Sequence, residues 1–357
     1  MEKDFKEKLD YVFEKLGHDQ SNLEFCVKIG EGAWHEVYKI KEKLKKEQVI
    51  RIKKEKAYGE IQEFNKSELL TEYETTKLYY KKANKCYSYF CPTEFNYFID
   101  HKIVFTVESF MGKSLKLNDL NHTKAYDYGV ILGDFFKKMH NEKPTINDFG
   151  NLIWNGKSLK GTEKLDIEQI WKKENDFLLD TLDRLNTSQL SFDRQKVNDK
   201  INSIINYRRN QIQKISLVNQ DVTPENIIFS ENRVSLIDPF PKLDFELKFA
   251  GYFFFCYKFL LPAYSNAPRY IDNEYEKNRL ILSSIAEGFA YQYTKDDQEE
   301  LKKLRDEYIL WVLLEAYDHY SILEKGNISQ KVKLKMGDIN ILKNRLNLCL
   351  KELQGFA

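Results

Sequence analysis

Three polar side chains stand close together in the stretch 217–238, which reads LVNQDVTPENIIFSENRVSLID. Asp221 is followed five positions later by Asn226, and Asp238 comes twelve positions after that. Transfer of a phosphoryl group from a nucleotide needs one carboxylate to accept a hydroxyl proton, and an amide plus a second carboxylate to hold Mg²⁺ on the phosphates. The residue types and their order therefore indicate this chemistry.

Short apolar runs position these three residues. The runs 215–218, 227–229 and 234–237 are rich in β-branched and apolar residues, and Ser-Glu-Asn-Arg separates the last two. They predict a tight hairpin that has Asp221 and Asn226 on the loop before it and Asp238 directly after it. Two strands of about four residues span only roughly 13 Å, so the hairpin can return Asp238 to Asn226. Taken alone, Asp, Asn and Pro are also ordinary loop residues.

A second motif lies about 190 residues upstream, where Gly30 and Gly32 separate two alternating segments that resemble strands. A glycine loop of this kind brings backbone N–H groups close to a phosphate chain. Because the glycines fall between strands rather than before a helix, a dinucleotide-binding motif is disfavoured.

The next alternating segment, 48–53, supplies cations. Val49, Arg51 and Lys53 share one face of it, from which a cation could reach phosphates under the glycine loop. A helix is predicted over 66–82, and Glu72 on it is a candidate partner for the strand cation. Its apolar stripe consists of Leu69, Leu70, Tyr73, Thr76, Leu78 and Tyr79. Taken one at a time, Arg51, Lys53 and Glu72 are equally well explained as ordinary residues on a solvent-exposed face.

Taken together, the motifs resemble the aminoglycoside phosphotransferase and choline kinase branch of the protein-kinase-like superfamily over about residues 25–257. The family's catalytic loop, His-Gly-Asp-(Leu)-x-Pro-x-Asn, is similar to residues 219–226, and its metal loop is similar to Ile237-Asp238-Pro239. Residues 130–140 resemble the family's helix that ends in an apolar residue and His. Residues 103–112 resemble its last N-lobe strand and the hinge.

The resemblance implies an α+β, bilobal protein-kinase-like fold. Residues 1–110 would form a small N-lobe with a helix at its start, an antiparallel sheet and one inserted helix, and residues 111–357 a larger, mostly helical C-lobe. The implied activity is Mg²⁺-dependent transfer of the γ-phosphoryl group of ATP or GTP to a hydroxyl of a small molecule, such as an aminoglycoside, an amino alcohol or a sugar-like compound.

The resemblance also implies roles for single residues. Asp221 would be the catalytic base, and Asn226 and Asp238 would hold Mg²⁺. Arg51 would be the phosphate-binding cation, with Lys53 as the fallback. Adenine would sit against Ile29, Val37 and Val49 and bond to backbone groups near Glu108 and Phe110. The residues implied for nucleotide binding are Gly30, Gly32, His35, Val37, Arg51, Lys53, Glu72, Glu108 and Phe110.

The sequence departs from the family at four positions. Asn219 and Gln220 replace the His and Gly before the catalytic Asp, although Asn can still hydrogen-bond the neighbouring backbone. His35 occupies the third glycine position of the phosphate loop and adds a side chain that stiffens or partly closes it. Pro239 replaces a glycine and fixes φ, which argues against an activation switch by loop flipping.

Two rival hypotheses follow. The acceptor could be a protein Ser or Thr, in which case the cleft beside Asp221 would be open and flat. Alternatively, the fold could serve as a non-catalytic binding scaffold, for which Asn219, Gln220 and His35 are the motivation.

The acceptor itself stays open. Helices over 167–185 and 197–205, and the segment 308–320, are expected beside the acceptor cleft. A polycationic acceptor would require carboxylates, for which Glu174, Asp176, Asp180, Asp183, Glu315 and Asp318 are available. A choline-like acceptor would require an aromatic cage, for which Tyr252, Phe253, Tyr257 and Trp311 are available.

Composition bounds the possible partners. The 56 Lys and Arg nearly cancel the 55 Asp and Glu, so charge gives no case for nucleic acid or a membrane surface. Five scattered cysteines and a charged amino-terminal segment favour a reducing, cytoplasmic setting. The apolar stretch 249–261 is too short to span a bilayer and reads as a buried helix. Oligomeric state is not indicated.

Overall fold

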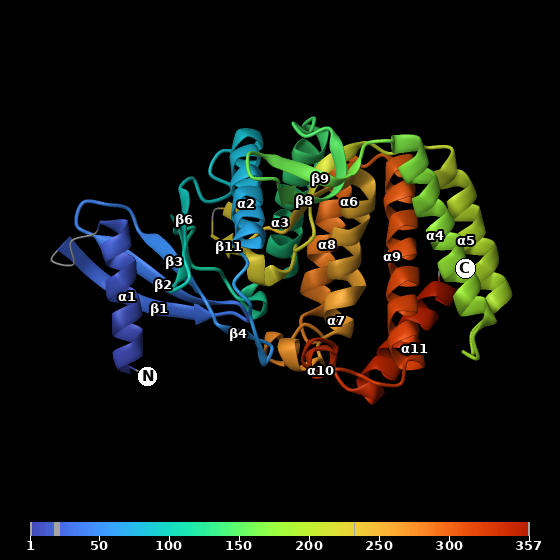
Figure 1. The fold of residues 1–357 in the computed structure, drawn as a ribbon. Helices are drawn as coiled ribbons and strands as arrows, with labels where there is room; N and C mark the ends of the chain where they lie inside the picture. Colours follow the sequence, from blue (N-terminus) through green and yellow to red (C-terminus); the bar gives the residue numbers. More distant parts are fainter. Residues whose placement is uncertain (1, 18–21, 232, 356–357) are drawn as a thin grey trace.

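The computed structural model describes residues 2–17, 22–231 and 233–355, with the side chains of residues 2–6 excluded. An antiparallel sheet with two helices forms one end of the molecule, and a larger, mostly helical part forms the other (Figure 1). We call them the N-lobe (α1 to β7) and the C-lobe (η2 to α11). The predicted bilobal α+β fold is confirmed. Asn232 of the predicted hairpin turn and the side chain of Phe5 lie outside the described residues.

The N-lobe sheet has the strand order β1-β2-β3-β7-β6, and all its neighbouring pairs are antiparallel. Its strands are β1 Leu23–Glu31, β2 His35–Glu42, β3 Gln48–Lys53, β7 Val104–Ser109 and β6 Phe95–Ile99. Helix α1 (Glu2–Leu16) packs Val12 and Phe13 onto one face of the sheet, against Tyr38, Ile50 and Phe105. Side chains alternate along each strand, so Val37, Arg51 and Lys53 project from the opposite face.

Helix α2 (Lys66–Cys86) follows a small hairpin made of β4 (Lys56–Ala57) and β5 (Glu60–Ile61). The Asn65 side chain caps α2 by accepting the N–H groups of Ser67 and Glu68. In the first half of α2, Leu69 and Tyr73 are buried against the sheet. This anchoring fixes Glu72 and Tyr80 relative to β3 and β7.

The C-lobe is built around two pairs of packed helices, α3 with α8 and α6 with α9. Helices α3 and α8 approach closely because Gly129 and Gly288 lie at their contact, where an added Cβ would meet backbone atoms at 2.1 Å. The helices are α3 His122–Asn141, α4 Ile167–Thr187, α5 Arg194–Arg209, α6 Glu246–Phe255, α7 Leu261–Ala263, α8 Arg279–Thr294, α9 Gln298–Glu324, α10 Gln330–Met336 and α11 Ile339–Gly355. The 3₁₀ segments are η2 Leu117–Asp119, η3 Pro224–Asn226 and η5 Pro268–Asn273.

The buried apolar stretch 249–261 is helical, but it changes to π-type hydrogen bonding in η4 (Cys256–Leu260) before α7. Among the described residues, no helix combines the length and apolar character needed to cross a bilayer.

The C-lobe was predicted to be mostly helical, but it also contains a four-stranded sheet. β8 (Asp148–Trp154) and β9 (Leu159–Lys164) join β10 (Ile215–Asn219) and β13 (Pro241–Phe245) in a sheet of order β10-β13-β8-β9. β9 is largely exposed and polar, so it lacks the apolar alternation that marks a strand in sequence. The predicted hairpin is present as β11 (Ile227–Ser230) and β12 (Arg233–Leu236).

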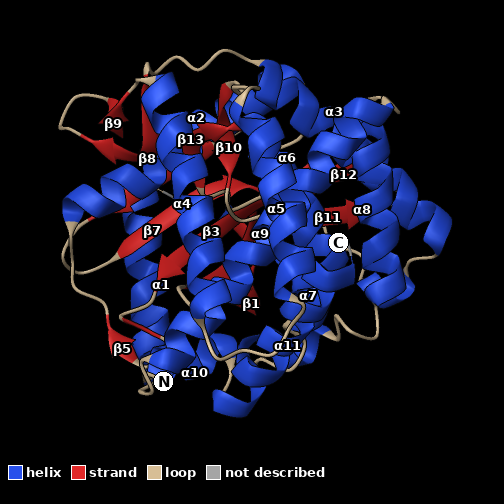
Figure 2. Ribbon diagram, turned by 90° about the vertical axis from the view of Figure 1, so that its right-hand side faces the viewer, coloured by secondary structure: helices blue, strands red, loops and turns tan. Residues whose placement is uncertain are grey.

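Helices α4 and α5 were expected beside the acceptor cleft. Figure 1 places both helices at the end of the molecule farthest from β1, next to α9, and α11 also contacts α5. Figure 2, which views the molecule from that end, shows helices in front and the strands of the N-lobe behind them. Both helices therefore lie far from the N-lobe, and their place beside the acceptor cleft stays a prediction.

Candidate active site

The loop after β10 is organised by Asn219, whose side chain is buried. Its Oδ1 accepts the N–H groups of Asp221 (3.1 Å) and Phe240 (2.8 Å), and its Nδ2 donates to the Asp221 carbonyl at 2.9 Å. The Gln220 N–H also donates to the Phe240 carbonyl at 2.9 Å. Asn219 thus bonds the neighbouring backbone, as expected, and it also joins the loop of Asp221 to the loop of Asp238.

Asp221 is half-buried at the start of this loop. The Thr223 hydroxyl donates to its Oδ1 at 3.0 Å. Burial raises the pKa of Asp221, and the hydrogen bond from Thr223 opposes that shift. One carboxylate oxygen is therefore held by the loop itself, in a partly desolvated setting.

Asn226 and Asp238 lie side by side at one end of the β11–β12 hairpin. Ile227 pairs with Leu236, and the Ile237 N–H donates to the Asn226 carbonyl at 2.9 Å. This bond is local to the hairpin, so the sequence spacing was sufficient to predict the neighbourhood of the two residues.

Asp238 has a left-handed backbone, with φ of 47°. This conformation is uncommon for an L-residue, and the proline at position 239 further restricts the residue before it. The Asp238 N–H donates to the Tyr80 hydroxyl at 3.0 Å, which anchors the strained position to α2. Its carboxylate remains half exposed. Strain of this kind concentrates at functional sites.

The two strand cations have different partners. Arg51 donates from Nε to Glu108 Oε1 at 2.8 Å, and its Nη1 lies 3.9 Å from Asp238 Oδ2. Lys53 instead pairs with Glu72 at 3.1 Å. Burial lowers the pKa of Arg51, but Glu108 and Asp238 outweigh that effect and raise it. Glu72 is therefore the partner of the fallback cation and not of Arg51.

The Glu108 side chain links β3 to α2. Its side chain is 2% exposed and receives Arg51 on one oxygen and the Tyr80 hydroxyl on the other, at 3.1 Å. Tyr80 was not among the candidates predicted from the sequence. The chain Arg51–Glu108–Tyr80–Asp238 connects β3, β7 and α2 to the metal-loop candidate.

The glycine loop lies at the β1–β2 turn. Neither Gly30 nor Gly32 has a left-handed backbone, and a Cβ on either would meet nothing closer than 4.0 Å. The fold itself therefore does not require glycine at either position. The Gly32 N–H donates to the His35 carbonyl at 2.9 Å.

His35 begins β2 and lines a small pocket together with Arg51, Glu72, Tyr80 and Asp238. Its Nε2 is buried and has no hydrogen-bond partner among the described residues. Burial lowers the pKa of His35 to about 4, and the neighbouring Asp238 opposes that shift. The end of the glycine loop and the metal-loop candidate thus meet in one pocket.

The expected adenine contacts are only partly available in this structure. Val37 and Val49 lie on the pocket-facing side of the sheet, and Ile29 is 46% exposed. The Phe110 N–H, however, donates to the Glu47 carbonyl at 3.1 Å, and the Met111 carbonyl accepts Arg233. Two backbone groups of the hinge are therefore engaged within the protein.

The candidate acceptor residues fall into two groups. Three of those on α4 are ion-paired: Glu174 with Lys248, Asp176 with Arg209 and Asp180 with Arg184. Glu315 on α9 is different, because it accepts the Tyr264 hydroxyl at 2.7 Å in a buried setting that raises its pKa. Of the aromatic candidates, Tyr252 and Trp311 pack together with their ring centroids 4.7 Å apart. The hydroxyl of Tyr257 is buried and has no hydrogen-bond partner among the described residues.

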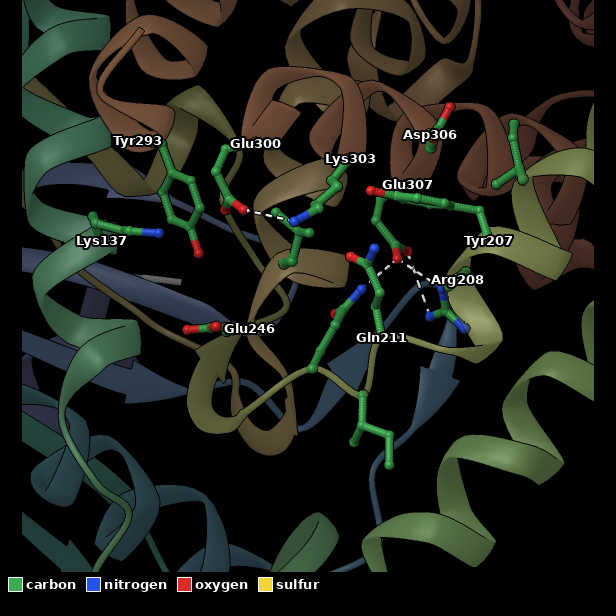
Figure 3. A pocket seen from close by; sticks show the side chains of 14 residues that line it. Lys137, Tyr207, Arg208, Gln211, Glu246, Tyr293, Glu300, Lys303, Asp306 and Glu307 are labelled. Carbon is green, nitrogen blue, oxygen red and sulfur yellow. Dashed lines mark hydrogen bonds and ion pairs between the residues drawn. The ribbon is translucent and has the colours of Figure 1, made fainter. Parts of the chain in front are cut away.

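Another pocket, lined by α5, α8 and α9, contains many charged side chains (Figure 3). Most of them pair with one another: Glu307 receives Arg208 and Gln213, and Glu300 receives Lys303. This pocket shares no lining residue with the one at Asp238.

Comparison with known proteins identifies the fold. No protein-family model and no curated protein matches the sequence. Two solved structures of a thermostable mutant of aminoglycoside phosphotransferase APH(4)-Ia do match, each at 13% sequence identity. The complex with AMP-PNP and hygromycin B has a TM-score of 0.53 and covers 96% of this chain and 97% of its own. The complex with ADP and hygromycin B has a TM-score of 0.52, with 98% coverage of each. The chain therefore has the kinase-like fold of the aminoglycoside phosphotransferases.

Proposed function

We propose that this protein is a Mg²⁺-dependent phosphotransferase that moves the γ-phosphoryl group of ATP or GTP to a hydroxyl of a small molecule. The observation that carries the proposal is that Asn219 accepts the N–H groups of Asp221 and of Phe240, which joins the Asp221 loop to the loop of Asp238, and that Arg51 lies beside Asp238. In the similar APH(4)-Ia structures a nucleotide and hygromycin B are bound together, which supports a small hydroxylated acceptor.

Asp221 is the proposed proton acceptor. Thr223 holds one of its oxygens, so the other can point toward an acceptor hydroxyl. A raised pKa suits a general base, because it brings proton affinity closer to the working pH.

Asn226 and Asp238 are the proposed Mg²⁺ ligands. Their side chains offer oxygen donors, which Mg²⁺ prefers, and the hairpin holds them next to each other. When bound, the ion would neutralise charge that develops on the phosphates. Asp238 keeps half of its carboxylate exposed, so it can reach such an ion.

Arg51 is the proposed phosphate-binding cation, with Lys53 still the fallback. Arg51 remains charged when buried, and it already lies beside Asp238. Gly30 and Gly32 would let the loop backbone approach the phosphates from above, and Val37 and Val49 would contact the base. With the lobe boundary proposed at residues 110 and 111, the nucleotide would lie between the lobes.

Paired substitutions test the assignment. Asp221→Asn should abolish transfer, by about 10³-fold or more, while leaving Mg²⁺–AMP-PNP affinity within about threefold. Asp238→Asn should weaken Mg²⁺-dependent AMP-PNP binding by about tenfold or more, because it removes a charged ligand of the ion. Calorimetric titration of AMP-PNP with and without Mg²⁺, and phosphate release from ATP and GTP over a panel of aminoglycosides, amino alcohols and sugars, measure both.

Asp127→Asn is the matched control, because it makes the same change on an exposed position of α3. Two results would contradict the proposal: wild-type protein with no Mg²⁺-dependent nucleotide binding, as expected of a scaffold, or full turnover in the Asp221 variant. Phosphorylation of a protein Ser or Thr with no small-molecule acceptor would shift the function to the protein-kinase alternative.

A further inference from the structure

The β4–β5 hairpin has an unusual turn. Tyr58 and Gly59 have φ of 52° and 79°, and the strands on either side contain two residues each. Two consecutive positive φ angles favour Asn-Gly or Asp-Gly, and a bulky side chain in the first position is strained. A hairpin of this length is not stable alone. Contacts elsewhere must therefore hold Tyr58 in place.

Those contacts come from both lobes. Within the N-lobe, the Tyr58 ring meets the edge of Trp34, a residue of the glycine loop, with centroids 5.9 Å apart. From the C-lobe, Arg269 of η5 donates from Nη1 to the Tyr58 hydroxyl at 2.5 Å, and Lys335 of α10 lies 4.8 Å from the ring centroid. In the view of Figure 1, β4 lies between β1 and α10.

Arg269 also reaches the loop of the proposed catalytic residues. Its Nη2 lies 3.6 Å from Glu225 Oε2, and Glu225 immediately precedes Asn226. The Asn273 side chain donates to the other oxygen of Glu225 at 3.3 Å. Arg269 is thus held from both sides, by Tyr58 in the N-lobe and by Glu225 in the C-lobe.

We propose that Tyr58 and Arg269 form an interlobe latch, which closes the lobes on the side of the catalytic loop, and that Arg269 is a positioning residue for Glu225 and Asn226. Because Tyr58 also touches Trp34, the latch joins the glycine loop to the loop that carries the proposed Mg²⁺ ligand. The consequence for catalysis depends on the proposed function: nucleotide would leave only when the latch opens.

The strained backbone at Tyr58 favours opening of the latch. When Arg269 releases the hydroxyl, the turn loses the contact that offsets its unfavourable backbone, so the hairpin should loosen as a unit. The hairpin and Arg269 are on different lobes, so a change at Arg269 that loosens the hairpin reports the contact between lobes directly.

Hydrogen exchange of the full chain without ligand tests the latch. Arg269→Ala should speed exchange of the hairpin amides over residues 55–62, including the Gln62 N–H that bonds the Glu55 carbonyl, by about tenfold or more. Arg269→Lys, which keeps a donor, should restore most of the protection. Lys277→Ala is the control, because it removes an exposed cation from the neighbouring segment, where it pairs with Glu274.

Tyr58→Phe is a second, milder variant that removes only the hydroxyl. It should give the same pattern at a smaller magnitude, with the melting temperature unchanged within about 2 °C. Hairpin exchange equal to wild type in both Arg269→Ala and Tyr58→Phe would overturn the proposal.

Release of a fluorescent ADP analogue with Mg²⁺ then links the latch to function. Arg269→Ala should release it at least about threefold faster than wild type or Lys277→Ala. If the wild type binds no nucleotide, the proposed function fails, whereas the latch is still judged by hydrogen exchange. If nucleotide binds and release is unchanged, the latch has no role in exchange of nucleotide.

Discussion

Asn219 occupies the position of a histidine in the motif of the family that the sequence resembles. Its amide both accepts and donates, so it satisfies two backbone N–H groups and one carbonyl at once. The Oδ1 atom alone joins the two loops, and the Nδ2 atom adds a bond to the Asp221 carbonyl. The departure from the family motif is therefore compatible with an ordered loop at Asp221.

Substitution of Asn219 measures the value of these bonds. Asn219→Ala should destabilise the fold by about 2 kcal/mol, because it leaves the N–H groups of Asp221 and Phe240 without their partner. Asn219→Asp keeps the acceptor and loses the donor, so it should cost less. Urea unfolding followed by circular dichroism gives both values, and an Asn219→Ala midpoint equal to wild type would disprove the role.

Strand β3 shows how one element serves two ion pairs of different kinds. Arg51 and Lys53 share a face because they are two positions apart, yet Arg51 meets a buried carboxylate and Lys53 a half-exposed one. A charge that is left unpaired in a buried place costs far more than one that water can reach.

Loss of Arg51 should therefore affect the stability of the protein more than loss of Lys53. Arg51→Met should lower the free energy of unfolding by about 3 kcal/mol, because it leaves the buried Glu108 carboxylate without its ion-pair partner. Lys53→Met should lower it by less than about 1 kcal/mol. The double variant Arg51→Met with Glu108→Gln should recover part of the loss. Thermal unfolding of the three variants compares them, and equal losses for Arg51→Met and Lys53→Met would contradict this account.

Across the whole molecule, buried histidines make stability depend on pH. Burial lowers the pKa of His140 to about 3 and those of His35 and His319 to about 4. Unfolded histidine titrates near 6.5, so between pH 6.5 and about 4 the unfolded chain takes up protons that the folded chain does not. For these groups, stability is fully present above pH 6.5 and falls as the pH decreases below it.

His140 allows a direct test because its Nδ1 meets the Tyr293 hydroxyl at 2.9 Å in the C-lobe core. Wild type should lose about 1 kcal/mol more stability than His140→Gln between pH 6.5 and 5.5. The comparison cancels the carboxylates that titrate in the same range. Urea midpoints at the two pH values measure it, with the exposed His101→Gln as the baseline. Parallel losses in wild type and His140→Gln would show that His140 does not contribute.

The sequence by itself determined the features that depend on short spacing. The hairpin after Asn226 returns the chain to Asp238 within twelve residues, and alternation along 48–53 puts Arg51 and Lys53 on one face. Both follow from the covalent chain and the geometry of strands, which few distant contacts can change.

Tertiary structure decided what depends on segments far apart in the chain. The pairing of Arg51 with Glu108, the bond from Asp238 to Tyr80 and the contact of Tyr58 with Arg269 join residues separated by 57, 158 and 211 positions. The location of α4 and α5 at the far end, and the recruitment of polar β9 into a sheet, are of the same kind. Packing of whole elements selects these partners, and no local pattern of residues encodes that choice.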